Sequence, residues 1–271
     1  MPELPEVETT RRGIAPHVID RRVTGVVIRQ PQLRWPITPG LAEELTGRQF
    51  QQVTRRGKYL LFAAGDKHLM IHLGMSGRLR IVPSSLSPEK HDHLDISLDS
   101  GQTIRFNDPR RFGSAFWLPG EPAQFSLLVA LGPEPLSDDF DGEHLHTRSR
   151  GRSAPVKAFV MDSKTVVGVG NIYASEALHA AGIHPARAAG KVSLARYKKL
   201  ASDIKHTLET AITAGGTTLR DYVGVDGGSG WFQLQLAVYG KAGQACPRGC
   251  GPIQQRVIGQ RNTFFCPECQ R

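Results

Sequence analysis

The sequence lacks every sign of membrane insertion or export. No apolar run approaches the ~18 residues of a membrane-spanning helix. The first residues, MPELPEVETTRRG, lack the apolar core of a secretory signal. These absences predict a cytoplasmic protein with no membrane partner. There is also no internal repeat, and the 39% hydrophobic and 22% charged content of the 271 residues is typical of a globular chain.

Acidic residues are too few to balance the basic ones. The chain has 25 Asp and Glu against 34 Lys and Arg, which gives a net charge of +9. A basic excess favours a polyanionic partner, nucleic acid first. The charge alone does not decide the matter, because many basic proteins bind no nucleic acid.

Cysteine is absent until residue 246. The four cysteines then form two close pairs, Cys246 with Cys250 in CPRGC and Cys266 with Cys269 in CPEC. Persistent disulfides are not expected in a reducing cytoplasm, and four thiolates in two knuckles match one structural zinc ion. Four reduced thiols in a tail are the alternative, which the clustering disfavours. The first pair has C-x3-C spacing rather than the commoner C-x2-C.

The segment between the two pairs predicts a β-hairpin. Its apolar arms are 257–258 and 263–265, and its polar turn is 259–262. A zinc ribbon of this size has almost no core, so the metal would hold the fold and the tip would carry function. Arg261 lies at that tip, where the ordinary alternative is a solvated arginine without a role.

The two halves of the chain have different patterns. After a helix signal in residues 1–13, short β-type runs predict an antiparallel sandwich or barrel. These runs are Val23–Arg29, Lys58–Phe62, His68–Leu73, Arg78–Val82, His93–Leu98, Thr103–Asn107 and Ser114–Leu118. A proline- and acid-rich connector, GPEPLSDDFDG, then leads into predicted helices at Val156–Asp162, Asn171–Ala181 and Leu194–Ala214.

The extreme N-terminus has the residues for amine chemistry. Removal of the initiator Met from a Met-Pro start would expose Pro2 as a secondary amine, whose pKa of ~8 leaves more free base at neutral pH than a lysine has. Such an amine condenses with a sugar aldehyde carbon to give an iminium, an electron sink for elimination. Glu3 and Glu6 lie within reach as proton-transfer partners. An ordinary helix start is the alternative.

Several further segments have a possible role and an ordinary alternative. Gly168 and Gly170 precede a predicted helix, where backbone N–H groups bind phosphate and Asn171 adds a donor and a cap; a plain capped helix fits equally well. The HDH sequence at 91–93 could bind metal or phosphate, and phosphate is favoured because the cysteines already supply a zinc set. Lys58 begins an apolar strand, where a lysine usually extends its charge to solvent.

The loop NDPRRFG, residues 107–113, combines charge with an aromatic ring. Arg110 and Arg111 precede Phe112, an arrangement that can enter a base stack beside phosphate contacts. Spacing alone favours a capped turn with a core phenylalanine. Met75 in HLGMSG has the same two interpretations, as an apolar probe or as a core residue.

These motifs occur together in one family. In chain order they are MPELPEVET, RRGKYLL, HLGMSG, EKHDH, NDPRRFG, LGPEPLSDDF, VVGVGNIYASE, GGTTLRD and QRNTFFC. Over essentially its whole length the sequence resembles the bacterial formamidopyrimidine-DNA glycosylases, also called 8-oxoguanine DNA glycosylase/AP lyases. The resemblance implies an α+β multidomain chain, with a β-sandwich at 1–130, a helix–two-turn–helix domain at 131–236 and a zinc ribbon at 237–271.

The resemblance also implies an activity. It predicts a bifunctional, monomeric enzyme of base excision repair that removes oxidised purines opposite cytosine from double-stranded DNA and nicks the strand by β,δ-elimination. Pro2 would attack C1′ and form the Schiff base, and Glu3 would protonate the sugar ring and open it. Lys58 would assist elimination, and Arg261 would grip a phosphate in the δ step. Zinc would be structural, with no catalytic metal or organic cofactor.

The same resemblance assigns the DNA contacts. Met75, Arg110 and Phe112 would fill the gap left by the extruded nucleotide, with Arg110 donating to the orphan cytosine. The other contacts would come from His91, Arg152, Lys157 and Asn171, with Arg152 in a less clearly matching stretch. Thr217–Tyr222 matches a loop near the flipped purine.

Two other functions stay open. An enzyme of the endonuclease VIII type would use the same mechanism on oxidised pyrimidines, although the Pro-Glu-Leu-Pro-Glu start and the NDPRRFG loop favour purines. A DNA-binding or ribosome-associated zinc protein without activity would keep the helical module. The joint presence of Pro2, Glu3 and Lys58 argues against that second alternative.

Overall fold

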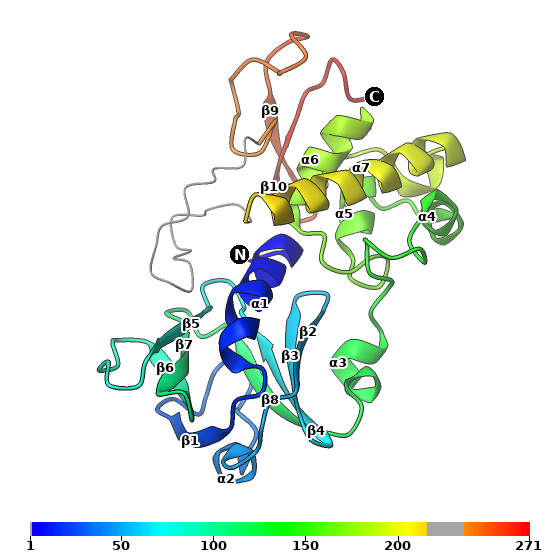
Figure 1. The fold of residues 1–271 in the computed structure, drawn as a ribbon. Helices are drawn as coiled ribbons and strands as arrows, with labels where there is room; N and C mark the ends of the chain where they lie inside the picture. Colours follow the sequence, from blue (N-terminus) through cyan, green and yellow to red (C-terminus); the bar gives the residue numbers. More distant parts are fainter. Residues whose placement is uncertain (1, 216–235) are drawn as a thin grey trace. The chain divides into compact units, whose positions relative to one another are not determined.

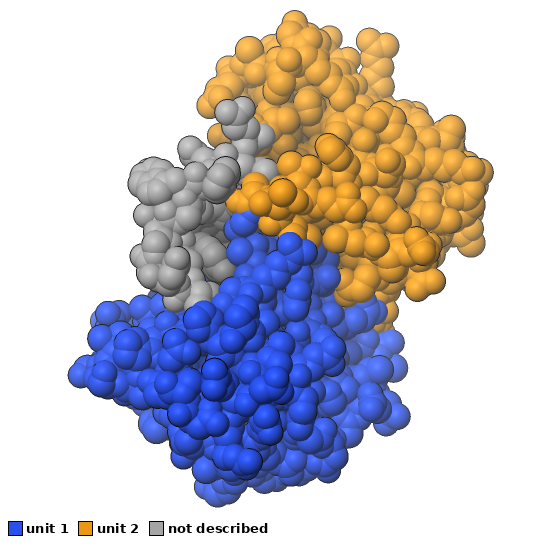
Figure 2. Space-filling model, viewed as in Figure 1, with its two compact units in different colours: residues 1–129, 215–233 blue, residues 130–214, 234–271 orange. Residues whose placement is uncertain are grey.

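The structure is a computed structural model that describes residues 2–215 and 236–271, so the Thr217–Tyr222 segment lies outside the described residues. The chain divides into two compact units (Figure 1), which are coloured separately in Figure 2. Unit 1 contains residues 2–129, and unit 2 contains residues 130–214 and 236–271. Within the described ranges, every helix is too short or too polar to span a lipid bilayer.

Unit 1 contains two antiparallel four-stranded sheets, ordered β1-β6-β7-β5 and β2-β3-β4-β8 (Figure 1). Their strands are β1 (Val23–Ile28), β2 (Gln52–Arg56), β3 (Tyr59–Ala64), β4 (Lys67–His72), β5 (Arg78–Pro83), β6 (Asp92–Leu98), β7 (Gln102–Asn107) and β8 (Ser114–Pro119). The unit is therefore a sandwich, one of the two architectures that the strand pattern allowed. Strand β2 was not expected, because its sequence QVTRR is mostly polar and only its pairing with β3 makes it a strand.

Apolar side chains of both sheets form the core of unit 1. Phe50, Phe62, Phe106 and Trp117 are among the buried aromatic residues, and burial of each such ring stabilises the fold by about 1.5–3 kcal/mol. Short helices complete the unit: α2 (Leu41–Leu45), η1 (Pro122–Gln124) and α3 (Ser126–Val129).

Helix α1 (Leu4–Val18) buries one face in the same core. Glu3 caps it: the Glu3 side chain accepts from the backbone at Glu6, and the Glu6 carboxylate accepts from the Glu3 backbone N–H at 2.8 Å. The helix extends beyond the predicted residue 13, because Ile14 and Val18 are fully buried and packing outweighs the weak helix propensity of that segment.

The Glu8 carboxylate connects α1 to β2. It accepts hydrogen bonds from Arg11 (2.8 Å) and Arg12 (2.8 Å) of the helix and from Arg55 of the strand (3.3 Å). Burial by itself raises the pKa of Glu8, but the three guanidinium groups outweigh burial and lower that pKa to about 2.

Unit 2 begins as a helical bundle. Its helices are α4 (Gly142–Ser149), α5 (Val156–Met161), α6 (Asn171–Ala181), η2 (Ala189–Lys191) and α7 (Leu194–Thr213). The three predicted helices are confirmed to within a residue or two. Helix α4 was missed; it starts where the acidic connector supplies Asp141 as an N-cap that accepts from the His144 backbone (2.7 Å). Gly182, in the left-handed region, ends α6 as the GIHP sequence predicts.

The last part of unit 2 is a hairpin of β9 (Gln254–Ile258) and β10 (Arg261–Phe265). Its turn is only Gly259 and Gln260, both at positive φ (57° and 60°), a geometry suited to two-residue hairpin loops. The predicted turn at 259–262 was too wide: Arg261 is already the first residue of β10 and pairs with Ile258. A small cluster, Val238, Ile253 and Phe264 with the cysteines, is the core of this part.

We predict that Glu8→Gln lowers the stability of unit 1 by about 1–2 kcal/mol at pH 7, since the charge-assisted hydrogen bonds are lost. The pKa of Glu8 is lower in the folded state than the ordinary 4.5. Ionisation therefore stabilises the fold fully above pH 4.5, and this stabilisation disappears as the pH falls towards 2. Thermal unfolding at pH 7, 4.5 and 3.5 should show the difference from wild type narrowing only below 4.5. A difference that is the same at all three pH values would contradict this account.

Candidate functional site

The N-terminal residues are held in place by α1. Pro2 is half-buried directly before the helix, and Glu3 is 2% exposed at its N-cap. Helix α1 packs against β2 and β3, and Glu8 links it to Arg55. The position of residue 2 is therefore determined by a buried, capped helix rather than by a free chain end.

Lys58 lies in the two-residue turn between β2 and β3, where Gly57 takes the positive φ of 57°. The positive charge of the Lys58 ammonium group affects the pKa of His72. Burial, followed by the positive charges of Lys58 and Arg34, lowers the pKa of His72 to about 4. His72 is therefore neutral at pH 7, and its Nδ1 accepts from the Gly74 backbone N–H (3.0 Å).

Two loops of unit 1 meet at Gly74. A Cβ atom at Gly74 would lie 2.3 Å from the backbone carbon of Phe112. The backbones of the two loops therefore approach more closely than a residue with a side chain at position 74 would allow. The first loop carries Met75 and the second carries Arg110. The structure thus brings together two motifs that are separate in sequence, HLGMSG and NDPRRFG.

The side chains at this junction are accessible. Phe112 is 39% exposed, and the Arg110 guanidinium lies over its ring, 4.8 Å from the centroid. Met75 is half-buried. The alternative of a core phenylalanine is therefore wrong, because packing of the loop backbone on Gly74 directs the Phe112 side chain outward instead of into the sandwich.

His91 belongs to the same region. Its backbone, at a positive φ of 74°, accepts from the Asp108 N–H (3.0 Å), and the His93 ring Nε2 donates to the Asp108 carbonyl (2.8 Å). His93 is thus a buried structural residue, whereas His91 is half-exposed. Of the described residues, only the four cysteines form a group of at least three potential ligands for a metal, so the HDH sequence offers no such group.

A polar cluster joins three segments of unit 2. Lys157 is only 1% exposed, and its Nζ donates to Asn171 Oδ1 (2.5 Å), Thr263 Oγ1 (2.7 Å) and the Asn262 carbonyl (3.3 Å). Asn171 Nδ2 in turn donates to the Asn262 carbonyl (3.0 Å) and to Tyr239 Oη (3.3 Å). Helices α5 and α6 and the hairpin are therefore fixed to one another beside Arg261.

The predicted cap at Asn171 needs a correction. Gly170 is the N-cap of α6, and Asn171 is the first helical residue. Its side chain cannot cap the helix, because it is engaged by Lys157.

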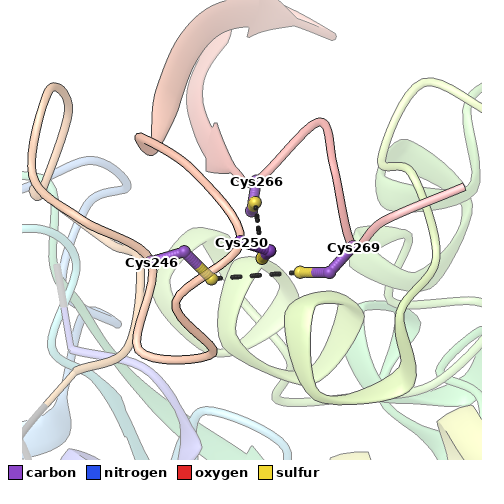
Figure 3. A group of neighbouring side chains, drawn as sticks. All are labelled: Cys246, Cys250, Cys266 and Cys269. Carbon is purple, nitrogen blue, oxygen red and sulfur yellow. Dashed lines mark hydrogen bonds between the residues drawn. The ribbon is translucent and has the colours of Figure 1, made fainter.

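The four cysteine side chains converge at one end of unit 2 (Figure 3). Their sulfur atoms all lie within 4.8 Å of one another, with Cys246–Cys269 at 3.9 Å and Cys250–Cys266 at 3.4 Å. Tetrahedral coordination with Zn–S bonds of ~2.3 Å requires S–S edges of about 3.8 Å. The C-x3-C spacing of the first pair therefore does not prevent a four-sulfur metal site.

The four thiols affect one another's ionisation. Burial and hydrogen bonds with the other three thiols raise the pKa of Cys269 to about 12. Four thiolates at these distances would repel one another strongly, and a bound divalent cation removes that repulsion.

Two family models match the sequence. The formamidopyrimidine-DNA glycosylase N-terminal domain matches residues 1–115, and the formamidopyrimidine-DNA glycosylase H2TH domain matches residues 131–223. The chain belongs to the formamidopyrimidine-DNA glycosylase family. The two matches correspond to the sandwich and the helix–two-turn–helix domain that the resemblance implied.

Individual relatives are similar to this chain over essentially its whole length. Formamidopyrimidine-DNA glycosylase of Syntrophotalea carbinolica is 56% identical over 271 residues, which cover 100% of both chains. The crystal structure of the Fpg protein of Thermus thermophilus is 40% identical with a TM-score of 0.88, over 99% of this chain and 98% of that one. A complex of Lactococcus lactis Fpg with DNA containing an abasic site is 34% identical with a TM-score of 0.91, over 99% of each chain.

The residues assigned from the family resemblance are divided between the units. Unit 1 contains Pro2, Glu3, Lys58, Met75, His91, Arg110 and Phe112. Unit 2 contains Arg152, Lys157, Asn171, Arg261 and the cysteines. Arg152 is exposed in the loop between α4 and α5, where its backbone carbonyl accepts from Gly190 N–H (2.9 Å). The burial of Lys157 gives it a clear structural task, and its contact with DNA stays a prediction.

Some residues of the site were missed from the sequence. Ser76 and Asp108 connect the two loops of unit 1, and Thr263 and Tyr239 complete the polar cluster of unit 2. The Asp-Pro pair in NDPRRFG does indicate a turn in which the aspartate side chain binds nearby backbone. The sequence has no signal for contacts such as that between Asp108 and Ser76, which lie far apart along the chain.

We predict that Lys157→Met destabilises unit 2 by about 2 kcal/mol, because it removes the donor from Asn171 Oδ1 and from the buried Thr263 Oγ1. Lys164→Met, at an exposed position of the same unit, is the control. Thermal unfolding should show a loss of several degrees for Lys157→Met alone. Equal unfolding temperatures for the two variants would show that the cluster adds no stability.

Proposed function

We propose that this chain is a bifunctional DNA glycosylase/AP lyase of base excision repair. It removes oxidised purines, 8-oxoguanine and formamidopyrimidines, from duplex DNA and nicks the strand by β,δ-elimination. The observation that carries the proposal is Pro2, half-buried directly before a capped and anchored helix, with Glu3 beside it. The whole-chain similarity to enzymes named formamidopyrimidine-DNA glycosylase supports the same activity.

The proposed nucleophile is the nitrogen of Pro2. Once Met1 is removed, it is an α-amine with a pKa of ~8, so an appreciable fraction is unprotonated at neutral pH. It attacks C1′ of the damaged nucleotide, and the bond from C1′ to the base breaks. A retained Met1 would convert this amine into an amide and abolish the reaction.

Glu3 and Lys58 would move the protons. The Glu3 carboxyl group protonates the ring oxygen of the sugar, the ring opens, and an iminium forms between C1′ and Pro2. Loss of a proton from C2′ then expels the 3′ phosphate, and a second elimination expels the 5′ phosphate. Lys58 assists elimination, and its turn lies next to the strand that Glu8 links to α1.

DNA recognition would use side chains of both units. A nucleotide must leave the duplex to reach Pro2, which costs a few kcal/mol. Met75, Arg110 and Phe112 would refill the stack, with Arg110 donating to the orphan cytosine. His91, Arg152, Lys157, Asn171 and Arg261 would hold the phosphate backbone, so affinity should fall steeply with salt.

One zinc ion would be held by Cys246, Cys250, Cys266 and Cys269. A zinc ion bound there would supply structural stability by cross-linking two knuckles that share only a small core. We further propose three domains, 1–130, 131–236 and 237–271, in a monomer that acts in the bacterial cytoplasm at the nucleoid.

Covalent trapping tests the nucleophile. Mature protein incubated with an abasic-site oligonucleotide and borohydride should give a stable covalent adduct, because borohydride reduces the iminium. Intact mass should show that Met1 is missing. The matched control is the same chain with an uncleaved N-terminal extension, which should give no adduct. Absence of an adduct with the mature protein, or equal adducts with both forms, would exclude Pro2.

The substrate class is tested by comparing lesions. Duplexes containing 8-oxoguanine opposite cytosine should be cleaved faster than duplexes containing thymine glycol. A strong preference for thymine glycol would instead assign the chain to the endonuclease VIII type.

The role of Glu3 is tested by Glu3→Gln. The amide keeps an oxygen that can accept the capping hydrogen bond, so α1 should stay folded. Excision of 8-oxoguanine should fall about 10²–10⁴-fold, since general acid catalysis is lost. Cleavage at preformed abasic sites should persist in part, because it does not require base release. An equal loss of both activities would contradict the assigned role.

A further inference from the structure

Asp108 is a fully buried carboxylate (0% exposed) that the mechanism above does not use. Both of its oxygens are engaged. Oδ1 accepts from the Ser76 hydroxyl (2.6 Å), and Oδ2 accepts from the Gly113 backbone N–H (2.7 Å). Its main-chain carbonyl also accepts from the Arg111 N–H (3.1 Å). One carboxylate therefore ties its own loop together and fastens it to the loop of Ser76.

Ser76 extends this connection to Arg110. While its hydroxyl donates to Asp108, its oxygen accepts from the Arg110 backbone N–H (3.1 Å). Met75 is the preceding residue, and the next one before it, Gly74, touches the Phe112 backbone. The Ser76–Asp108 pair thus holds the backbone of Arg110 directly and that of Gly113, next to Phe112, while Met75 adjoins Ser76 in the chain.

The loop that carries Arg110 and Phe112 needs hydrogen bonds to hold its shape, because these two side chains do not pack in the core. The Phe112 and Arg110 side chains are exposed, so core packing does not fix them. A loop that is ordered only on binding loses its conformational entropy at that step, which weakens the stabilisation of the extruded state. A loop that is ordered during folding avoids this loss.

We propose that Ser76 and Asp108 are positioning residues that hold the Met75 and Arg110–Phe112 loops in the conformation that replaces an extruded nucleotide. This inference rests on the proposed function. Neither residue touches the reacting atoms. Their effect should appear in nucleotide extrusion and in discrimination of the opposite base.

The test compares Ser76→Ala with Ser76→Thr, which keeps the hydroxyl. Ser84→Ala is the matched control, since it removes a hydroxyl hydrogen bond to Thr103 (2.8 Å) in the same unit. The readouts are single-turnover excision of 8-oxoguanine opposite cytosine and opposite adenine, cleavage of abasic duplex, and thermal unfolding. An abasic nucleotide is the easier to extrude, because it has no base to unstack.

Ser76→Ala should lower the excision rate opposite cytosine at least tenfold and reduce the preference for cytosine. Its abasic-site cleavage should fall far less, and Ser76→Thr should recover most of the excision. Similar behaviour of Ser76→Ala and Ser84→Ala, or a parallel loss of excision and abasic cleavage, would overturn the proposal. Failure of the proposed function would appear separately, as absence of trapping and excision in the wild type.

A second, independent inference concerns the first cysteine knuckle. His179, near the end of α6, is 4% exposed, and its Nε2 lies 3.3 Å from Cys246 Sγ. Because a metal-binding sulfur is a thiolate, a His179 ring N–H on Nε2 would donate to it. Arg248, inside the knuckle, donates to the carbonyls of His179 (3.0 Å) and Ala180 (2.8 Å) in the last turn of α6.

These contacts hold the C-x3-C knuckle of Cys246 and Cys250 against α6. The knuckle that includes Arg248 is anchored to α6 at both the sulfur of Cys246 and the helix carbonyls, where a positive charge is also favoured by the helix dipole. A donor to a ligating sulfur fixes its orientation and reduces its charge, and loss of such outer partners weakens metal binding about 10–100-fold.

We propose that His179 positions Cys246 as a metal ligand and thereby slows loss of the ion. His179→Phe removes the donor, and His179→Gln keeps an N–H. His184→Phe is the control, because the His184 ring packs on Phe265 (4.7 Å between centroids) in the same part of unit 2. The readouts are the rate of zinc transfer to a chromogenic chelator and the sulfur-to-cobalt charge-transfer band of the cobalt-substituted protein.

His179→Phe should speed zinc transfer about tenfold and shift the cobalt band, and His179→Gln should lie between it and the wild type. His184→Phe should leave the band unchanged. Equal transfer rates and identical bands for His179→Phe and His184→Phe would overturn the proposal. Neither readout depends on DNA, so the result is independent of the proposed activity.

Discussion

The attachment of α1 to the sandwich is the constraint on which the N-terminal site depends. The proposed nucleophile is a main-chain nitrogen at the start of the chain, so only the residues that follow it can position it. The helix is fixed by apolar residues buried in the core and by Glu8, whose carboxylate binds Arg55 of β2 across the unit. The turn that carries Lys58 follows that strand. The Glu8–Arg55 contact therefore links the elements that carry both proposed reactive groups.

Elsewhere, the buried Asp108 and Lys157 hold segments that carry proposed DNA contacts. Asp108 and Ser76 order two surface loops of unit 1, and Lys157 joins Asn171 to the hairpin in unit 2. Such groups are costly to bury unless every donor and acceptor is paired, and a paired network admits few alternative arrangements. This property suits an enzyme whose proposed substrate must be distorted, because a binding surface that is already ordered keeps its shape when it bends DNA.

The accuracy of the sequence interpretation depended on how local each signal was. The C-terminal hairpin, the Gly182 helix stop and the four-cysteine cluster were predicted correctly, apart from the exact width of the hairpin turn, because each depends on residues close together in sequence. The sequence allowed two positions for the Phe112 side chain, in the core or at the surface, and the spacing favoured the core. The structure exposes it, because the decisive contact is with Gly74 on another loop. Strand β2 was missed because only its partner strand defines it.

By itself, the sequence determined the kinds of chemistry that this protein carries: an N-terminal proline beside a carboxylate, basic and aromatic residues in one loop, and a thiol set for a metal. Only the tertiary structure decided which of these side chains are buried and which are presented. Lys157 illustrates the difference, since its charge suggests a surface contact and its neighbours make it a buried connector. The physical reason is that burial depends on long-range packing, and contacts between distant residues leave no periodic pattern along the chain.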